Sequence, residues 1–104
     1  MTDDAKTECR TPSEDKSGST RIPSWKYDLI SAAISEAVIA AGPDGLAFSD
    51  LTEAVRERLE AVDLDRLGSL GWHVTTVKLE MEVRGDLARL PETLQRLIVP
   101  GMGS

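Results

Sequence analysis

The chain carries one histidine, His73, and one cysteine, Cys9, the residue types with which much site chemistry begins. A structural zinc site needs about four ligands, usually Cys and His, so the chain does not supply one. A disulfide within the chain is excluded because there is no second cysteine. We therefore predict that the protein binds no metal, and that Cys9 is an unpaired thiol.

Catalytic chemistry is equally hard to assemble. His73 would need a Ser or Cys nucleophile and an orienting acid, and no motif in the sequence groups these residues. Glu80 and Glu82 lie two residues apart, so on a helix their side chains diverge and do not form a paired carboxylate site. The motif GPDG at residues 42–45 is a turn signal and not a glycine-rich phosphate loop. The sequence thus predicts a protein that is not an enzyme and uses no cofactor.

The charge balance limits the class of partner. The 104 residues include 18 acidic and 12 basic side chains, which gives a net charge of −6. Phosphate contacts supply most nonspecific affinity for nucleic acid, so this charge argues against strong unaided binding to it. Residues 71–104, however, hold four acidic and four basic side chains besides His73. Any contact with a polyanion is therefore expected in this neutral C-terminal third.

The length and the distribution of apolar residues predict one small domain. Residues 1–20 contain hardly an apolar side chain and are expected to be a disordered tail that includes Cys9. The ordered domain is expected over residues 21–99, with a flexible C-terminus at 100–104. The chain has neither a run of about 18 apolar residues nor an apolar signal segment, so we expect a cytoplasmic protein with no membrane contact.

Two helices and a short strand are predicted in the first part of this domain. The first helix is expected to begin with Ser24 as its cap and to end at Gly42 and Pro43. A short strand over residues 46–48 follows, and Ser49 is expected to cap a second helix. Leucines spaced by three then predict a further turn of helix over the core edge. The apolar residues of the first helix are Tyr27, Ile30, Ile34, Ala37, Val38 and Ala41. Those of the second helix are Leu51, Val55, Leu59 and Val62, and the leucines of the further turn are Leu64, Leu67 and Leu70.

The segment VTTVKLEMEVRGDL, residues 74–87, can be interpreted as a strand or as a helix. A strand would leave residues 63–76 as an unusually long irregular connection. A helix over residues 73–84 avoids this, contains good helix formers, and ends at Gly85 as a left-handed stop. Such a helix has two apolar stripes on nearly opposite sides, with Val74, Val77, Met81 and Gly85 on one and Trp72, Thr76, Leu79 and Val83 on the other. Two further apolar runs, at residues 87–90 and 94–99, predict a β-hairpin after it.

The predicted order is helix, short strand, helix, turn, helix and two-stranded wing, which defines an α+β, mainly α fold of the winged helix-turn-helix type. The segment GWHVTTVKLEMEVRGDLARLP also resembles the third helix and wing entry of small bacterial winged-helix-like proteins of uncharacterised function. The resemblance extends more loosely over residues 21–99 through KYDLISAAI and LQRLIV. It departs at His73, where a second aromatic residue is expected, and in LQRLIV, which lacks a tryptophan. The resemblance implies a fold and no activity.

DNA binding with a regulatory role in transcription is the first functional hypothesis, because the third helix of winged-helix proteins normally enters the major groove. Two features count against it, namely the carboxylates on this helix and its second apolar stripe. The alternative is that the polar candidates are ordinary surface residues. The candidate contacts to double-stranded DNA are His73, Thr75, Thr76, Lys78, Arg84, Arg89 and Arg96.

A protein-interaction module is the second hypothesis, most simply a homodimer or an adaptor without DNA binding. Trp72, Leu79 and Val83 would form part of its buried patch. The alternative for this stripe is packing within the chain, because small domains use most of their large apolar side chains internally. A dimeric winged-helix regulator would unite both hypotheses.

Overall fold

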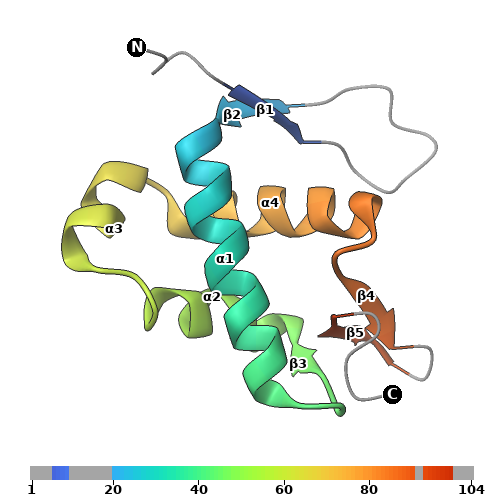
Figure 1. Cartoon of the computed structure of the whole chain (residues 1–104). Coiled ribbons are helices and arrows are strands. Elements are labelled where there is room, and N and C mark those ends of the chain that lie inside the picture. The colour runs from blue at the N-terminus through green and yellow to red at the C-terminus, as the bar shows by residue number, and fades with distance from the viewer. Residues whose placement is uncertain (1–5, 10–19, 91–92, 100–104) are drawn as a thin grey trace.

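The computed structural model of the chain describes residues 6–9, 20–90 and 93–99. The helices are α1 (Ser24–Ala41), α2 (Phe48–Arg56), α3 (Ala61–Leu67) and α4 (Leu70–Arg84). The strands are β1 (Lys6–Cys9), β2 (Thr20–Pro23), β3 (Leu46–Ala47), β4 (Ala88–Leu90) and β5 (Thr93–Ile98). Figure 1 shows α1 crossing α4, with one small sheet at the start of α1 and another beside its end. The predicted α+β, mainly helical class is confirmed.

The core forms where α1, α2 and α4 pack together. Helix α1 buries one side because its apolar residues recur every three or four positions, and α2 and α4 contribute the facing residues. The helix ends where predicted, at Gly42, whose φ of 84° favours glycine. Side chains with no more than 2% exposure in this cluster include Ile30, Ile34, Val38, Leu51, Val55, Val74, Val77 and Met81.

Two predicted caps are wrong. Ser24 is the first residue of α1 and not its N-cap, which is Pro23. The Ser24 hydroxyl lies 2.8 Å from the Thr7 hydroxyl instead. Ser49 lies inside α2, whose N-cap is Ala47 with extended backbone. In both cases the last residue of a paired strand is the N-cap, so the predicted serine lies one or two residues too far along the chain to occupy that position.

The second helix is shorter than its apolar spacing predicts. Leu51 and Val55 are buried as expected, but α2 ends at Arg56 and the chain is extended at Glu60. Val62 therefore lies on the separate helix α3 with 60% of its surface exposed. The predicted turn of helix near Leu67 is confirmed as α3, and Leu67 is buried.

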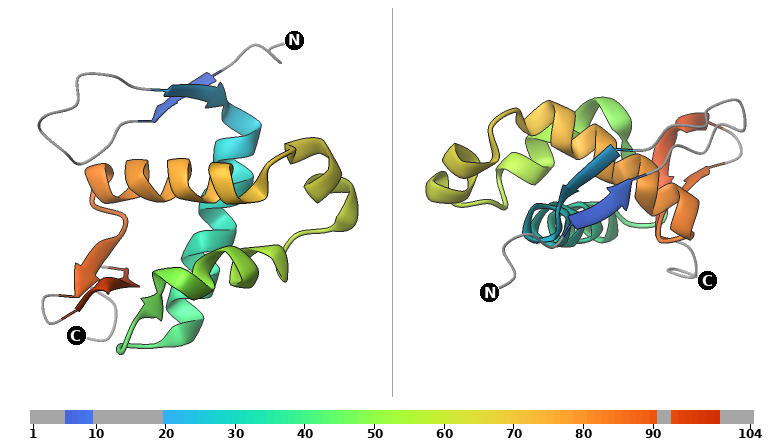
Figure 2. Two further views of the ribbon diagram at one scale, coloured as in Figure 1. Left: turned by 180° about the vertical axis from the view of Figure 1, so that it is seen from behind. Right: turned by 90° about the horizontal axis from the view of Figure 1, so that it is seen from above.

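The ambiguous segment is a helix, which confirms the prediction. Helix α4 begins three residues before His73, at Leu70, and the Ser69 hydroxyl caps it by accepting a hydrogen bond from the Trp72 amide at 3.3 Å. It ends at Arg84, and Gly85 is left-handed with φ 86° and ψ 10°. The left-hand view of Figure 2 shows α4 lying across the molecule with α1 behind it.

The predicted hairpin is also confirmed, and the short strand joins it. Strands β3, β5 and β4 form an antiparallel sheet in that order, with β5 in the centre. Ala47 pairs with Arg96, and Arg89 pairs with Leu97. Gly45 has a φ of +83°, and a Cβ on it would lie 3.0 Å from the Leu97 carbonyl oxygen. Glycine therefore allows the turn after α1 to approach β5 closely.

The N-terminal prediction needs correction at Lys6–Cys9 and Thr20. These residues are not a disordered tail, because β1 pairs antiparallel with β2, from Lys6 opposite Pro23 to Cys9 opposite Thr20. Cys9 is 3% exposed and packs in the core cluster with Ile22. The remainder of the predicted tail, residues 1–5 and 10–19, and the predicted flexible C-terminus, residues 100–104, lie outside the described residues.

Among the residues that the structure describes, no helix is long and apolar enough to cross a membrane.

Candidate protein-interaction face and its charged rim

Helix α4 has an inner and an outer face, as its two apolar stripes predict. The outer face of α4 comprises Trp72, Thr75, Thr76, Leu79 and Val83, which together span an arc of about 100° around the helix axis at 100° per residue. Trp72 is 46% exposed and Thr75 is exposed, while the other three are half-buried. In the left-hand view of Figure 2, no described helix or strand passes in front of α4.

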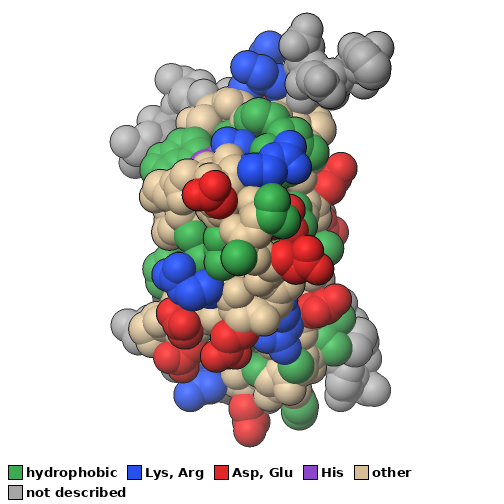
Figure 3. All heavy atoms as spheres, turned by 90° about the vertical axis from the view of Figure 1, so that its left-hand side faces the viewer, with side chains coloured by type: hydrophobic (Ala, Val, Ile, Leu, Met, Phe, Trp, Pro, Cys, Tyr) green, Lys and Arg blue, Asp and Glu red, His purple; other side chains and the backbone are tan. Residues whose placement is uncertain are grey.

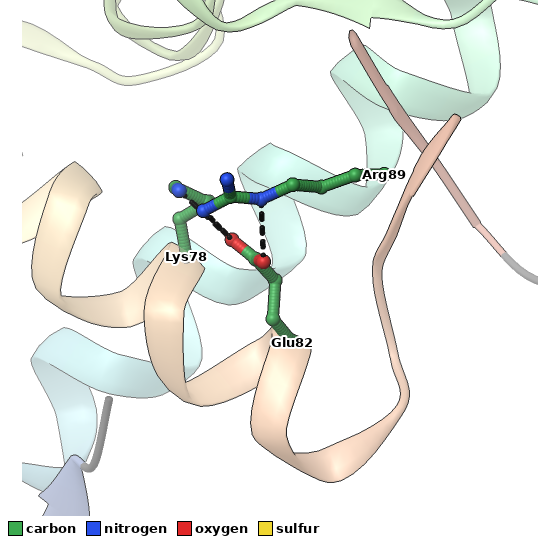
Figure 4. Close-up of polar contacts among 3 residues, drawn as sticks. All are labelled: Lys78, Glu82 and Arg89. Carbon is green, nitrogen blue, oxygen red and sulfur yellow. Dashed lines mark hydrogen bonds and ion pairs between the residues drawn. The ribbon is translucent and has the colours of Figure 1, made fainter. Parts of the chain in front are cut away.

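A cluster of three charged side chains lines one edge of this face (Figure 4). The Glu82 carboxylate accepts from Lys78 Nζ at 2.8 Å through Oε2 and from Arg89 Nε at 2.9 Å through Oε1. The Lys78 and Glu82 side chains are only 6% and 10% exposed, so solvent screens the pair weakly. Arg89 comes from β4, so the cluster also ties the hairpin to α4.

Phe48 completes this edge, because Lys78 Nζ lies 4.5 Å from the centre of its ring. The ring belongs to the first residue of α2 and is 41% exposed. The ammonium group is therefore held between a carboxylate and an aromatic ring, two environments that favour a cation. The sequence does not single out Phe48, because its contact with Lys78 joins residues 30 positions apart.

A second ion pair lies toward β1. Arg84 Nε donates to Glu80 Oε2 at 2.6 Å, and the Glu80 side chain is completely buried. This hydrogen bond raises the pKa of the Arg84 guanidinium above its ordinary value. The Arg84 guanidinium also lies 4.7 Å from the centre of the Tyr27 ring, on α1. Arg84 is thus engaged with a carboxylate and a π-face at the junction of α1 and α4.

Tyr27 and Cys9 are buried beneath this pair. The Tyr27 hydroxyl forms no hydrogen bond within the described part of the chain. Burial raises the pKa of Tyr27 to about 12, against the opposing effect of the Arg84 charge. Burial, reinforced by Glu80, also raises the pKa of the Cys9 thiol. Both groups are therefore kept protonated, which opposes nucleophilic reactivity of the thiol.

A polar hollow of about 440 Å³ lies between β1 and α4. Its lining residues are Lys6, Thr7, Glu8, Glu80 and Arg84. It contains two cations and two carboxylates, which is a mixed lining without a dominant charge. Over the described ranges, no group of three His, Cys, Asp or Glu side chains could hold a metal ion.

The predicted DNA contacts are placed in several different environments. Lys78 is 4% exposed, and His73 is 8% exposed with Nδ1 donating to the Ser69 carbonyl at 2.7 Å. Arg96 donates to the Gly45 carbonyl at 3.1 Å. Arg84 and Arg89 are paired with Glu80 and Glu82, as described above. Of the seven candidates, only Thr75 and Thr76 lie on the outer face of α4.

The predicted interface residues are brought together. Trp72, Leu79 and Val83 lie along one line on α4, and the Trp72 ring meets the His73 ring edge to face at 4.9 Å. Figure 3 shows the side of the molecule that carries α3, where acidic and basic side chains are interspersed with hydrophobic ones and no continuous basic area is visible. The arrangement can offer an apolar partner surface.

The described residues form a small, mainly helical α+β fold with two antiparallel sheets. The chain belongs to a family of unknown function, DUF6958, which matches residues 6–97. The match begins at the first residue of β1 and ends one residue before the end of β5, so it spans all four helices. Searches of the curated proteins and of the solved structures found no match.

Proposed function

We propose that this protein is a non-enzymatic interaction module of the winged-helix type, which binds another protein chain through the outer face of α4. The proposal is carried by one observation. The cations that flank this face are engaged within the chain, while Trp72 on it is 46% exposed and Leu79 and Val83 are half-buried. Such a surface suits a protein partner that covers it with apolar side chains of its own. Removing this face from water would break no ion pair on it.

Topology supports the winged-helix part of the proposal. The order from α1 to β5, with β5 between β3 and β4 in the sheet, is the order expected of a winged helix. In this interpretation α4 takes the position of the groove-reading helix and the β4–β5 hairpin is the wing. Helix α3 is then an extra short helix in the turn between α2 and α4.

The ion pairs favour a protein partner over DNA. A phosphate that approached Lys78 or Arg89 would have to compete with Glu82, and the affinity of proteins for DNA depends on cations that are free to replace counterions. Arg84 faces the same competition from Glu80. Apolar side chains, in contrast, occupy the part of α4 that would face base edges.

DNA binding is the second candidate function, because α4 and the β4–β5 hairpin would be the groove-reading elements if the fold is interpreted as a winged helix. Thr75 and Thr76 on the outer face can also donate to phosphates or base edges. This candidate requires Arg84 and Arg89, which are 41% and 40% exposed, to leave their carboxylates when DNA is bound. It therefore predicts affinity that falls steeply with salt.

Site-directed photo-crosslinking in cells tests the proposal. A photoreactive residue at Thr75, which is exposed on α4, is compared with one at Glu36, which is exposed on α1. We expect protein adducts from position 75 and few from position 36. Nucleic-acid adducts at position 75, together with salt-sensitive binding of random duplex by the purified chain at about 50 mM salt, would replace the proposal with the DNA candidate.

A further inference from the structure

We propose that the partner of the outer face of α4 is a second copy of this chain, bound across a two-fold axis with the two α4 helices antiparallel. This inference rests on the proposed function and names its partner. Its basis is the spacing of the stripe, the sizes of the side chains that this spacing brings together, and the absence of charge on the stripe.

The spacing of the stripe is the same when it is read from either end. Its line of residues, Trp72, Thr76, Leu79 and Val83, has spacings of four, three and four. A two-fold axis that passes midway along this line therefore brings each position of the stripe opposite a stripe position of the second copy. Trp72 then meets the partner's Val83, and Thr76 meets the partner's Leu79. Each contact occurs twice, as an isologous interface requires.

Size complementarity follows from the same pairing. The large Trp72 ring lies opposite a β-branched valine, and the small Thr76 lies opposite a leucine, so large side chains do not collide along the stripe. Tryptophan is also the residue type most often found as an anchor of protein interfaces. Its 46% exposed ring leaves part of its apolar area to be covered.

Charge allows two copies to meet at this face although the whole chain carries −6. The five outer-face residues are uncharged, and Lys78 and Glu82 at the edge are paired with each other. Antiparallel helices also place the positive N-terminus of one α4 beside the negative C-terminus of the other. Net repulsion between the copies acts at longer range, so added salt should screen it and favour the dimer.

The stripe is short, and this sets the expected affinity. Eleven residue steps of helix span about 16 Å, and two crossed helices of this length bury less than the roughly 1,600 Å² of a standard interface. We therefore expect a reversible dimer whose population rises over the micromolar to millimolar range.

Sedimentation equilibrium of the purified full chain tests the inference. We expect a monomer–dimer equilibrium that shifts toward the dimer as salt is raised. Leu79→Lys should raise the dissociation constant by about tenfold or more, as loss of a central contact typically does. Val62→Lys, at a 60% exposed position on α3, should leave it unchanged. Far-ultraviolet circular dichroism verifies that both variants keep the helical fold.

A mixing experiment tests the register. Thr76→Lys and Leu79→Glu should each weaken self-association, and an equimolar mixture should form a heterodimer because the new lysine faces the new glutamate across the axis. A mixture of Thr76→Lys with Leu79→Lys should not associate. Equal rescue in the two mixtures would overturn the antiparallel register.

The failure of this inference is distinguishable from that of the proposed function. A monomer at millimolar concentration, with crosslinks from Thr75 to a different protein, would overturn the self-association and leave the interaction module standing. Crosslinks from Thr75 at the mass of two copies would support both. Crosslinks to nucleic acid alone would overturn both.

Discussion

Lys78 and Glu82 lie one helical turn apart on α4 and are joined by an ion pair of 2.8 Å with both side chains at least 90% buried. Glu82 also binds Arg89, so one carboxylate balances two cations from different elements. Removing the carboxylate would leave the buried Lys78 ammonium and the Arg89 guanidinium without the negative charge that balances them. Glu82 therefore links β4 of the hairpin to α4 through an ion pair and balances the charge of buried Lys78.

Glu82→Gln should lower the free energy of unfolding by about 1–3 kcal/mol, because it leaves a buried cation without its charged partner. Urea denaturation measures the change. The matched control is Glu53→Gln, which removes the pair with Arg56 at 3.2 Å in a setting where Glu53 is 67% exposed. It should cost no more than about 0.5 kcal/mol. Equal losses in the two variants would contradict the role assigned to Glu82.

Gly45→Ala should destabilise the fold by about 1–3 kcal/mol, because the added methyl group must adopt a positive φ and meets the Leu97 carbonyl oxygen at 3.0 Å. Gly71→Ala is the control, since Gly71 is inside α4 and its added Cβ meets nothing within 4 Å. The control should stabilise the protein by about 0.5–1 kcal/mol through helix propensity. Thermal unfolding of both variants tests whether stability falls in Gly45→Ala and rises in Gly71→Ala.

Val55→Ala should cost about 2 kcal/mol, from the lost burial of its methyl groups and the cavity that remains. Val62→Ala should change stability by less than about 0.5 kcal/mol, because Val62 is 60% exposed whereas Val55 is fully buried. Chemical denaturation of the two variants measures this difference. Comparable losses would place both valines on one buried stripe, as their spacing alone suggests.

Tyr27 is the only tyrosine, so its ionisation can be followed by the absorbance of tyrosinate. The native protein should titrate with a pKa of about 12, whereas the unfolded chain should titrate near the ordinary value of about 10. Between these values the unfolded state loses its proton first. The contribution of Tyr27 to stability is therefore complete below about pH 10 and is lost as the pH rises toward about 12. A native midpoint near 10 would show that the hydroxyl is solvated.

Tyr27→Phe separates burial of the ring from burial of the hydroxyl. Because the hydroxyl has no hydrogen-bond partner among the described residues, its removal should leave stability unchanged or raise it. The loss of stability between about pH 10 and pH 12, which ionisation of Tyr27 causes, should also disappear in this variant. A loss of about 1 kcal/mol or more would indicate a hydrogen bond to the hydroxyl.

Local patterns were sufficient to predict α1, α4 and the hairpin. The helices have apolar residues at helical spacings, and Gly42 and Gly85 provide their ends. The boundary of α2 was not predictable from spacing, because Val62 continues the apolar period although Glu60 has already left the helical conformation. The helix propensity of a short stretch of sequence does not reflect contacts with distant residues, and those contacts decide where such a helix ends.

The candidate face was predicted in part. Trp72, Leu79 and Val83 follow from helical geometry, and the spacing of four from Lys78 to Glu82 and from Glu80 to Arg84 is visible in the sequence. The contact of Arg89 with Glu82 was not foreseeable, because it depends on the path of the chain through Gly85 into β4. The pairing of β1 with β2 was missed for a similar reason. Its polar sequence is ordered by a partner strand and by the burial of Cys9 and Ile22.

The pairing of β1 with β2 has a practical consequence for dissecting the gene. A fragment designed from hydrophobic periodicity would start near residue 21, which keeps β2 and deletes β1 with Cys9. Such a fragment would uncover Ile22 and the side of α4 that contacts β1. Loss of activity after this deletion would report a damaged fold, and so it would assign no role to the deleted residues. Expression clones meant to test function should therefore begin before Lys6.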